Sequence, residues 1–399
     1  MPNSENCPQT VFVLGAGCSV GQGIPTLFNF LDRGIEKLVQ GGRDVKYHLE
    51  NLKNFLSQVR AAGAYMNLPL LNIEEVYGIV DMAADVEENS ALAEEAANAL
   101  KARSALDCMI FEVCKQGGLD ILDHKEKYPF SDDDISQIKR NSNTEEIQAF
   151  DQGGPFTNIL AHICLWTYKD NSGAPPLFVI FNWDATLDRV TFFLDGNDNF
   201  TEFAEKAYFH VNGADFHSRP KIARPHGGIF WWKATETPPP GSLKIGESEE
   251  NGKDVYAVPF LNKDLSLNAE MAIAPPTWRK HATMEAFRIQ WKAIKQALQN
   301  ARQIIFIGYS FPRSDLHFRN FIAYALANNP YSPKVYAWNP GIISQNTPEK
   351  KQLRENYRDA FHPLLRQQRL FGIDIPFGSP ALLDPARALR IAELLSETE

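Results

Sequence analysis

The chain has 399 residues, of which 44% are hydrophobic and 22% charged, and its formal net charge is −9. This composition is typical of a globular protein with one large domain or two smaller ones. The acidic balance disfavours direct nucleic-acid binding, and five cysteines without a Cys-x-x-Cys pair disfavour a disulfide framework or a structural zinc module. No signal-peptide pattern and no apolar run of the roughly 18 residues that span a bilayer is present, so we expect a cytoplasmic protein.

The first predicted element is a buried strand over Val11–Leu14, followed by a turn containing Gly15 and Gly17 and then a helix. The helix is predicted from apolar residues at helical spacing: Ile24, Leu27, Phe28, Leu31, Ile35 and Leu38. A glycine turn between a strand and a helix can place backbone N–H groups against a phosphate. The glycines can equally be ordinary turn residues, and the dehydrogenase fingerprint fits poorly because its third glycine would fall at Val20.

The region 41–171 is predicted to be a helical insertion. Good helix formers dominate from Asn72 onward and again over Asn89 to Phe111. The polar stretch from Ser131 to Gly154 has the composition of an exposed loop, and we assign it no chemistry.

The second half of the chain alternates buried strands with helices, which predicts a Rossmann-like α/β fold with a parallel sheet and helices on both faces. The expected strands are 177–181, 221–224, 303–308 and 334–338, and the expected helices carry the apolar faces Phe287 to Leu298 and Phe318 to Ala325. The predicted domains are a sheet domain over 1–40 and 172–345, the helical insertion, and a C-terminal helical tail over 346–399. The stretch from Trp231 to Ala257 is expected to be a lid, a partner-binding loop or disordered.

Four polar turns follow predicted strands, at the edge where open α/β sheets bind ligands. They are Gly15-Ala-Gly-Cys-Ser19, Asn182-Trp-Asp184, His226-Gly-Gly228 and Gly308-Tyr-Ser310. In this order the set resembles the sirtuin superfamily, specifically the bacterial sirtuin-like branch associated with phage defence. The first turn, with Gly23-Ile-Pro25, resembles the sirtuin phosphate loop; Asn182-x-Asp184 and His226-Gly227 resemble the family's Asn-Ile-Asp and catalytic His-Gly.

Two further segments resemble the defence branch in particular: Gly308-Tyr-Ser-Phe-Pro312 with Asp315, and Pro275-Pro-Thr-Trp278 with Lys280. The resemblance covers roughly residues 8–40 and 172–342. The chain departs from deacylase sirtuins, because it has no four-cysteine zinc module and has Thr26-Leu-Phe28 where they have Asp-Phe-Arg. What remains of the family's site is the part that cleaves nicotinamide from NAD⁺.

The resemblance implies roles for individual residues in cleaving the bond between nicotinamide and ribose. Asn182 would orient the ribose hydroxyls or the attacking water, Asp184 would hold the carboxamide or support the cation, and His226 would act as general base. The pyrophosphate would lie against Ser19 and the amides of Ala16 and Gly17. The other residues predicted to bind NAD⁺ are Gly15, Pro25, Gly308, Ser310 and Asn339, the last three at the adenosine end.

Structural alternatives exist for these residues when each is considered alone. Asn182 and Asp184 are also typical residues for the start of a helix, and His226 is also compatible with a turn. Ser310 and Asn339 are common at strand ends. Cys18 is expected to fill a small apolar space rather than to act as a nucleophile.

The implied function is an NAD⁺ glycohydrolase that uses NAD⁺ as substrate without a metal and depletes it in anti-phage abortive infection. The resemblance also implies a homo-oligomer and an activating partner, either a HerA-type ATPase or a short Argonaute-like protein. Two alternatives are an NAD⁺- or ADP-ribose-sensing module without turnover, and a zinc-free deacylase or ADP-ribosyltransferase.

Overall fold

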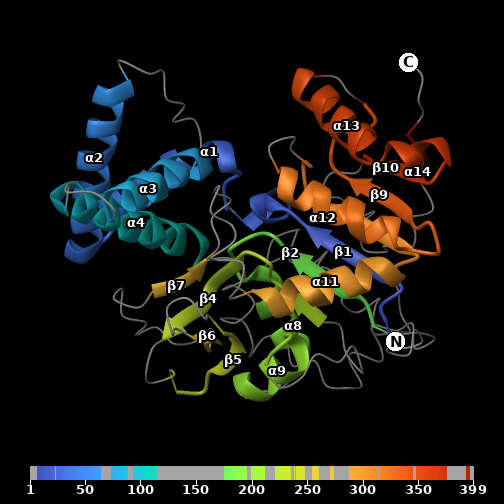
Figure 1. Ribbon diagram of the computed structural model, residues 1–399, viewed down its shortest axis with the longest axis horizontal. Coiled ribbons are helices and arrows are strands. Elements are labelled where there is room, and N and C mark those ends of the chain that lie inside the picture. The colour runs from blue at the N-terminus through green and yellow to red at the C-terminus, as the bar shows by residue number, and fades with distance from the viewer. Residues whose placement is uncertain are drawn as a thin grey trace, which may run out of the picture.

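The computed structural model describes residues 7–22, 24–63, 73–88, 93–115, 175–195, 199–211, 221–234, 238, 240–247, 254–259, 270–273, 287–311, 315–344, 347–374 and 392–395. It is an α/β protein with a seven-stranded, mostly parallel sheet and a second, four-stranded antiparallel sheet (Figure 1). The α/β class predicted from the sequence is confirmed. No helix within these ranges is long and apolar enough to cross a membrane.

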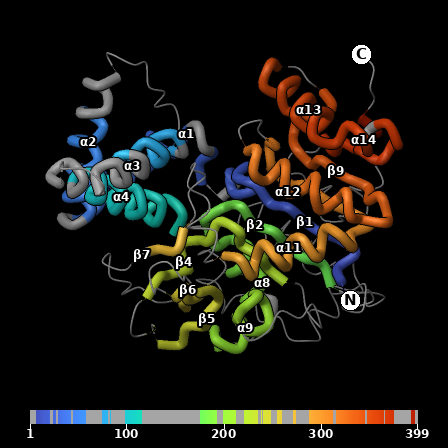
Figure 2. The backbone as a smooth tube through the Cα atoms, viewed as in Figure 1, coloured from blue at the N-terminus to red at the C-terminus, as the bar shows by residue number. Residues whose placement is uncertain are grey.

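The large sheet has the order β11-β10-β9-β8-β1-β2-β3. Its strands are β1 (Thr10–Leu14), β2 (Leu177–Ile180), β3 (Lys221–Ala223), β8 (Gln303–Ile307), β9 (Lys334–Trp338), β10 (Leu370–Ile373) and β11 (Glu393–Leu394). The predicted strands before β10 are all present. The strands β1 and β2, which are distant in sequence, lie side by side (Figure 2), and β8 pairs with the other edge of β1. Apolar runs identified them because parallel strands are buried on both faces.

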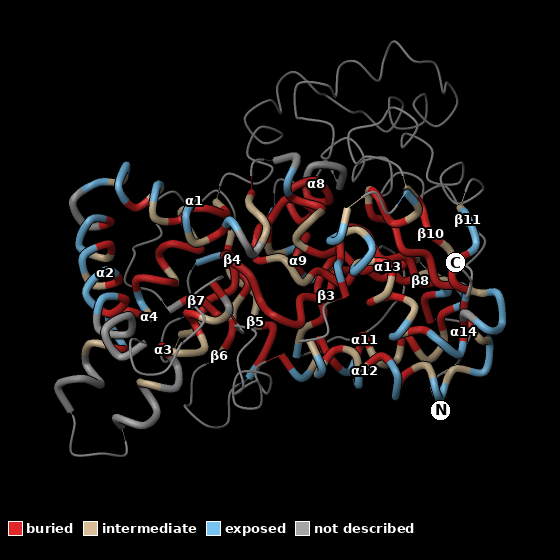
Figure 3. The backbone as a smooth tube through the Cα atoms, turned by 90° about the horizontal axis from the view of Figure 1, so that it is seen from above, coloured by how far each residue is buried: buried red, intermediate tan, exposed pale blue. Residues whose placement is uncertain are grey.

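The order of the strands reverses at β1. The chain passes from β1 to β2 and β3 on one side, and then places β8, β9 and β10 on the other side. The helices α11 (Arg288–Asn300) and α12 (Leu316–Ala327) lie side by side on one face of the sheet, and α8 (Thr186–Asp195) lies on the other (Figures 1 and 3). In such sheets ligands bind beyond the carboxyl ends of the strands at the reversal, here β1 and β8.

A lobe of four helices follows β1 and stands beside the sheets (Figure 1). Its helices are α1 (Leu27–Gln40), α2 (Arg43–Gly63), α3 (Ile73–Glu88) and α4 (Ala93–Cys114). The expected insertion is therefore helical over its described part, while residues 116–174, including the predicted polar loop, lie outside the described ranges.

The antiparallel sheet corrects one prediction. It has the order β5-β6-β4-β7, formed by β4 (Gly227–Ala234), β5 (Leu243–Gly246), β6 (Asp254–Ala257) and β7 (Glu270–Ile273). Trp231 to Ala257 was expected to be a lid, a partner-binding loop or disordered. Its described residues instead contain β5, β6 and the second half of β4, and residues 235–237, 239 and 248–253 lie outside the described ranges. β5 and β6 have four residues each and are only partly buried, so they lack the wholly apolar run that identifies β2. They are stabilised by pairing, β6 with β4 and β5 with β6.

The C-terminal region is only partly the helical tail that the sequence predicts. It contains α13 (Pro348–Ala360) and α14 (His362–Arg366), but β10 and β11 then extend the large sheet beyond β9. The helix α13 packs on the sheet, where Tyr357 and Phe361 contact the ring of Phe306 in β8. Figure 3 shows that the strands of both sheets run through the buried interior, with exposed residues mainly on the outer helices.

Candidate active site

The first glycine turn and the turn after β8 are in direct backbone contact. The Gly15 amide donates to the Ile307 carbonyl (3.0 Å), and the Gly17 amide donates to the Gly308 carbonyl (2.9 Å). A Cβ atom at Gly15 would lie 2.5 Å from the Tyr309 Cα atom, so the approach of the two turns requires glycine. The Gly17 amide, which the sequence analysis assigned to a pyrophosphate, is bonded within the protein here, and the contact of Gly17 with NAD⁺ stays a prediction.

The residues after this turn form a short 3₁₀ helix, η2 (Ala16–Gln22), rather than entering a long helix directly. Within it Cys18 is buried, and its thiol donates to the Ile307 carbonyl (2.7 Å). Burial raises the pKa of the Cys18 thiol well above its ordinary value. This agrees with the expectation that Cys18 is a packing residue, because thiolate is the nucleophilic form.

We expect the thiols of Cys18 and Cys114 to resist alkylation in the folded protein. Burial also raises the pKa of Cys114 well above its ordinary value. Iodoacetamide labelling under native conditions, read by peptide mass spectrometry, should leave both unmodified. The urea-unfolded protein is the control and should be modified at both positions; rapid native labelling of Cys18 would contradict its packing role.

A hydrogen-bonded chain connects this 3₁₀ helix to the turn after β2. The Asn182 side-chain amide donates to Ser19 Oγ (2.8 Å), and Ser19 Oγ donates to Asp184 Oδ2 (2.7 Å). The other carboxylate oxygen of Asp184 accepts from the Thr186 amide at the start of α8 (3.0 Å). Asp184 therefore also serves the helix-start role considered above. Ser19 and Asp184 are buried, whereas Asn182 is half-buried and so is the most accessible of the three.

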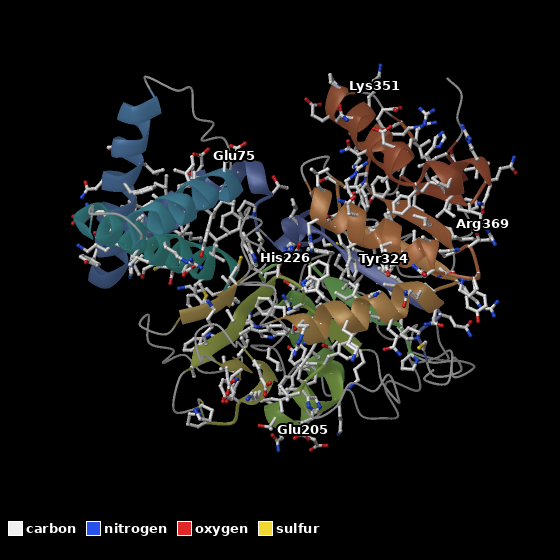
Figure 4. All side chains as sticks on the ribbon, viewed as in Figure 1. Glu75, Glu205, His226, Tyr324, Lys351 and Arg369 are labelled. Carbon is white, nitrogen blue, oxygen red and sulfur yellow. The ribbon has the colours of Figure 1, made fainter. Side chains whose placement is uncertain are left out.

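His226 lies between β3 and β4 in the chain, and Figure 4 shows it near the middle of the molecule. Its ring contacts Phe181 edge-on (centroids 5.0 Å apart) and approaches Trp291 of α11 (6.2 Å). The Ile229 amide in β4 donates to the Trp183 carbonyl (3.0 Å), which joins the strand after His226 to the turn that carries Asn182. The structure thus brings together the three predicted turns that end β1, β2 and β3.

Predicted residues at the adenosine end are held by the C-terminal region. The Asn339 side chain is buried and donates to the Tyr309 carbonyl (3.0 Å), which also accepts from the Tyr357 hydroxyl (2.6 Å). Ser310 is exposed, and its carbonyl accepts from the Asn356 side chain (3.2 Å). The contacts of Asn339 therefore position the turn after β8, and its contact with a nucleotide stays a prediction.

Several residues that shape the site were missed in the sequence. Phe181 and Trp291 contact His226, Tyr357 fixes the turn after β8, and Arg224 bonds the turn after β2. Arg224 carried the clearest signal, since an arginine at the end of a buried strand requires a partner. The aromatic residues resemble ordinary core residues in sequence, and only their position near His226 distinguishes them.

The remaining predicted residues are placed as follows. Ala16 opens η2, and Pro25 is half-buried immediately before Thr26 and α1. Gly23, Pro312, the Pro275 to Trp278 segment and Lys280 lie outside the described residues. Across the described ranges, no cluster of three or more His, Cys, Asp or Glu side chains is arranged to hold a metal ion.

Comparison with known proteins gives no assignment: no protein-family model matches the sequence, and neither does any curated protein.

Proposed function

We propose that the protein is an NAD⁺ glycohydrolase that produces nicotinamide and ADP-ribose. The observation that carries the proposal is the joining of separate turns at the reversal of strand order. Asn182 is hydrogen-bonded to Ser19 of the first turn, and His226 packs against Phe181 beside it. The reversal is where doubly wound sheets bind nucleotides, and the turns supply the Asn182 amide and the His226 imidazole there.

The proposed reaction breaks the bond between the ribose C1′ and the nicotinamide nitrogen. The bonding electrons leave with nicotinamide, which becomes neutral, and positive charge develops on the ribose. Water attacks C1′ and loses one proton, which His226 accepts as general base. Asn182 orients the ribose or the water. Asp184 does not contact the substrate: it accepts a hydrogen bond from Ser19, which in turn holds the Asn182 amide.

The engaged Gly17 amide changes the proposed binding mode. In the arrangement described, the first turn serves to hold the turn after β8 and, through Ser19, the Asn182 side chain. Of the residues predicted to bind the diphosphate, the proposal therefore keeps the amide of Ala16, which is half-buried at the start of η2. This assignment also belongs to the proposal.

The test is direct measurement of nicotinamide released from NAD⁺ by the purified chain, alone and with its genomic neighbour. We expect His226→Ala to lower the rate by about 10²–10⁴-fold, the range for loss of a general acid–base group. We expect Asn182→Ala to lower it by about 10²-fold, the cost of misplacing a reacting group. Matched controls are Asn328→Ala and His362→Ala, which replace the same residue types at exposed positions on other elements. Both controls should retain the wild-type rate.

Each other outcome has a defined meaning. Tight NAD⁺ binding without nicotinamide release would replace the proposal with a sensing module, and NAD⁺-dependent modification of a protein would indicate a deacylase or an ADP-ribosyltransferase. The proposal extends to anti-phage defence by NAD⁺ depletion in a homo-oligomer activated by a HerA-type ATPase or a short Argonaute-like protein. This extension rests on the resemblance of the four turns to the defence branch.

A further inference from the structure

Arg224 follows β3, and its buried guanidinium bonds the turn after β2 in two places. Nη1 donates to the Asn182 carbonyl (2.8 Å), and Nη2 donates to the Asp184 carbonyl (2.6 Å). Nε donates to Asp188 Oδ1 (3.0 Å), and Nη2 also pairs with Asp188 Oδ2. One side chain therefore holds both ends of the Asn182–Asp184 turn and is itself bound to α8.

The anchor for this arginine is also buried. Asp188 is fully buried in α8, and it accepts a third hydrogen bond, from the Tyr208 hydroxyl (2.7 Å). Burial and the nearby Asp188 carboxylate raise the pKa of Tyr208 well above its ordinary value, so the hydroxyl remains a donor. Burial acts to lower the pKa of Arg224, but Asp188 outweighs it and the net pKa is raised. Both donors thus keep their protons around neutral pH.

The same arginine also shapes the turn that carries His226. Its carbonyl accepts from the Gly227 amide (3.1 Å), which closes the turn around His226. A Cβ atom at Gly228 would lie 3.0 Å from Arg224 Nη1 and 3.2 Å from the Trp183 carbonyl oxygen, so the guanidinium fits tightly between the two turns. The side chain of Arg224 fixes one turn while its backbone fixes the other.

We infer that Arg224 is a positioning residue that sets Asn182 relative to His226 for cleavage of the NAD⁺ glycosidic bond, an inference that rests on the proposed function. Arginine is required because one planar group must donate to a carboxylate and to two carbonyls in different directions. Lysine retains the charge opposite Asp188 but has a single nitrogen on a flexible stem, so it cannot hold both carbonyls in the same geometry.

The test compares Arg224→Lys with Arg189→Lys, the same substitution at another buried arginine, which lies in α8 and donates to the Lys115 carbonyl (2.9 Å). We expect Arg224→Lys to lower kcat by about 100-fold, the cost of misplacing reacting groups by about 1 Å, with KM for NAD⁺ nearly unchanged. Amide hydrogen exchange at Ile229, whose amide donates to the Trp183 carbonyl, should become faster. Arg189→Lys should change neither kcat nor this exchange.

Tyr208→Phe is the second variant, and it decides the matter if Arg224→Lys does not fold. It removes one hydrogen bond from Asp188, so it should also lower kcat, by less than Arg224→Lys does, and leave KM for NAD⁺ nearly unchanged. Wild-type kcat together with wild-type Ile229 exchange in the folded variants would overturn the inference, as would an equal loss in Arg189→Lys. If the wild-type chain does not cleave NAD⁺, the proposed function fails. The Ile229 exchange then decides by itself whether Arg224 fixes the turn.

Discussion

Replacing Asp188 with alanine is expected to destabilise the protein by about 3–5 kcal/mol, the usual cost of leaving a buried charge without its partner. The side chains of Asp188 and Arg224 are 0% and 3% exposed, so water cannot replace the lost carboxylate. Tyr208 loses its acceptor in the same variant. The loss is a large fraction of the 5–15 kcal/mol that is typical of folded proteins. Denaturant unfolding followed by tryptophan fluorescence measures it.

The control for this prediction is an exposed ion pair. Glu202 and Lys206 pair within α9 (Phe200–Ala207), with side chains 48% and 37% exposed. Glu202→Ala should therefore cost only about 0–1 kcal/mol, since solvent screens such pairs. If Asp188→Ala cost no more than Glu202→Ala, the buried network would not have the structural role that we assign to it.

Gly308→Ala is expected to separate the two turns that meet at the reversal of the sheet. Gly308 has a φ of +62°, and a Cβ atom there would lie 2.3 Å from the Cys18 backbone nitrogen. A left-handed conformation costs an alanine about 1–2 kcal/mol, and overpacking against backbone adds about 1–3 kcal/mol. We expect a lower unfolding midpoint and a loss of NAD⁺ cleavage together, because Gly308 also accepts from the Gly17 amide.

Gly241→Ala is the matched control, because it separates conformational strain from the contact between turns. Gly241 has a φ of +71°, but a Cβ atom there would be no closer than 3.5 Å to its neighbours. It should show only the conformational cost, with cleavage unchanged. Equal destabilisation by the two substitutions would contradict the argument that the meeting of the turns requires glycine at 308.

The sequence predicted the framework of the fold well, because its signals are local. The apolar runs at Val11–Leu14 and Leu177–Phe181 identified β1 and β2, since a strand covered on both faces has little polar surface. The predictions failed where stability depends on distant partners. The strands β5 and β6 have four residues each, and β10 is held by pairing with β9.

In the candidate site, too, local features could be predicted from the sequence and contacts between distant segments could not. The positions of polar turns after predicted strands were visible in sequence, and these turns do meet around β1. The sequence did not show that the Gly17 amide donates its hydrogen bond to the Gly308 carbonyl. It also did not show that Asp184 contacts Ser19 rather than solvent. Such choices depend on distances between segments that are far apart in the chain.

The sequence by itself therefore determined five consecutive strands of the large sheet, from β9 to β3, and the residues that follow them, because burial and periodicity are properties of neighbouring residues. Only the tertiary structure decided which donors and acceptors satisfy one another. Arg224 is the clearest case: its charge is evident from the sequence, but its four hydrogen bonds to Asn182, Asp184 and Asp188 depend on three segments meeting in a buried space. A buried charge must be paired, and the fold alone selects the partner.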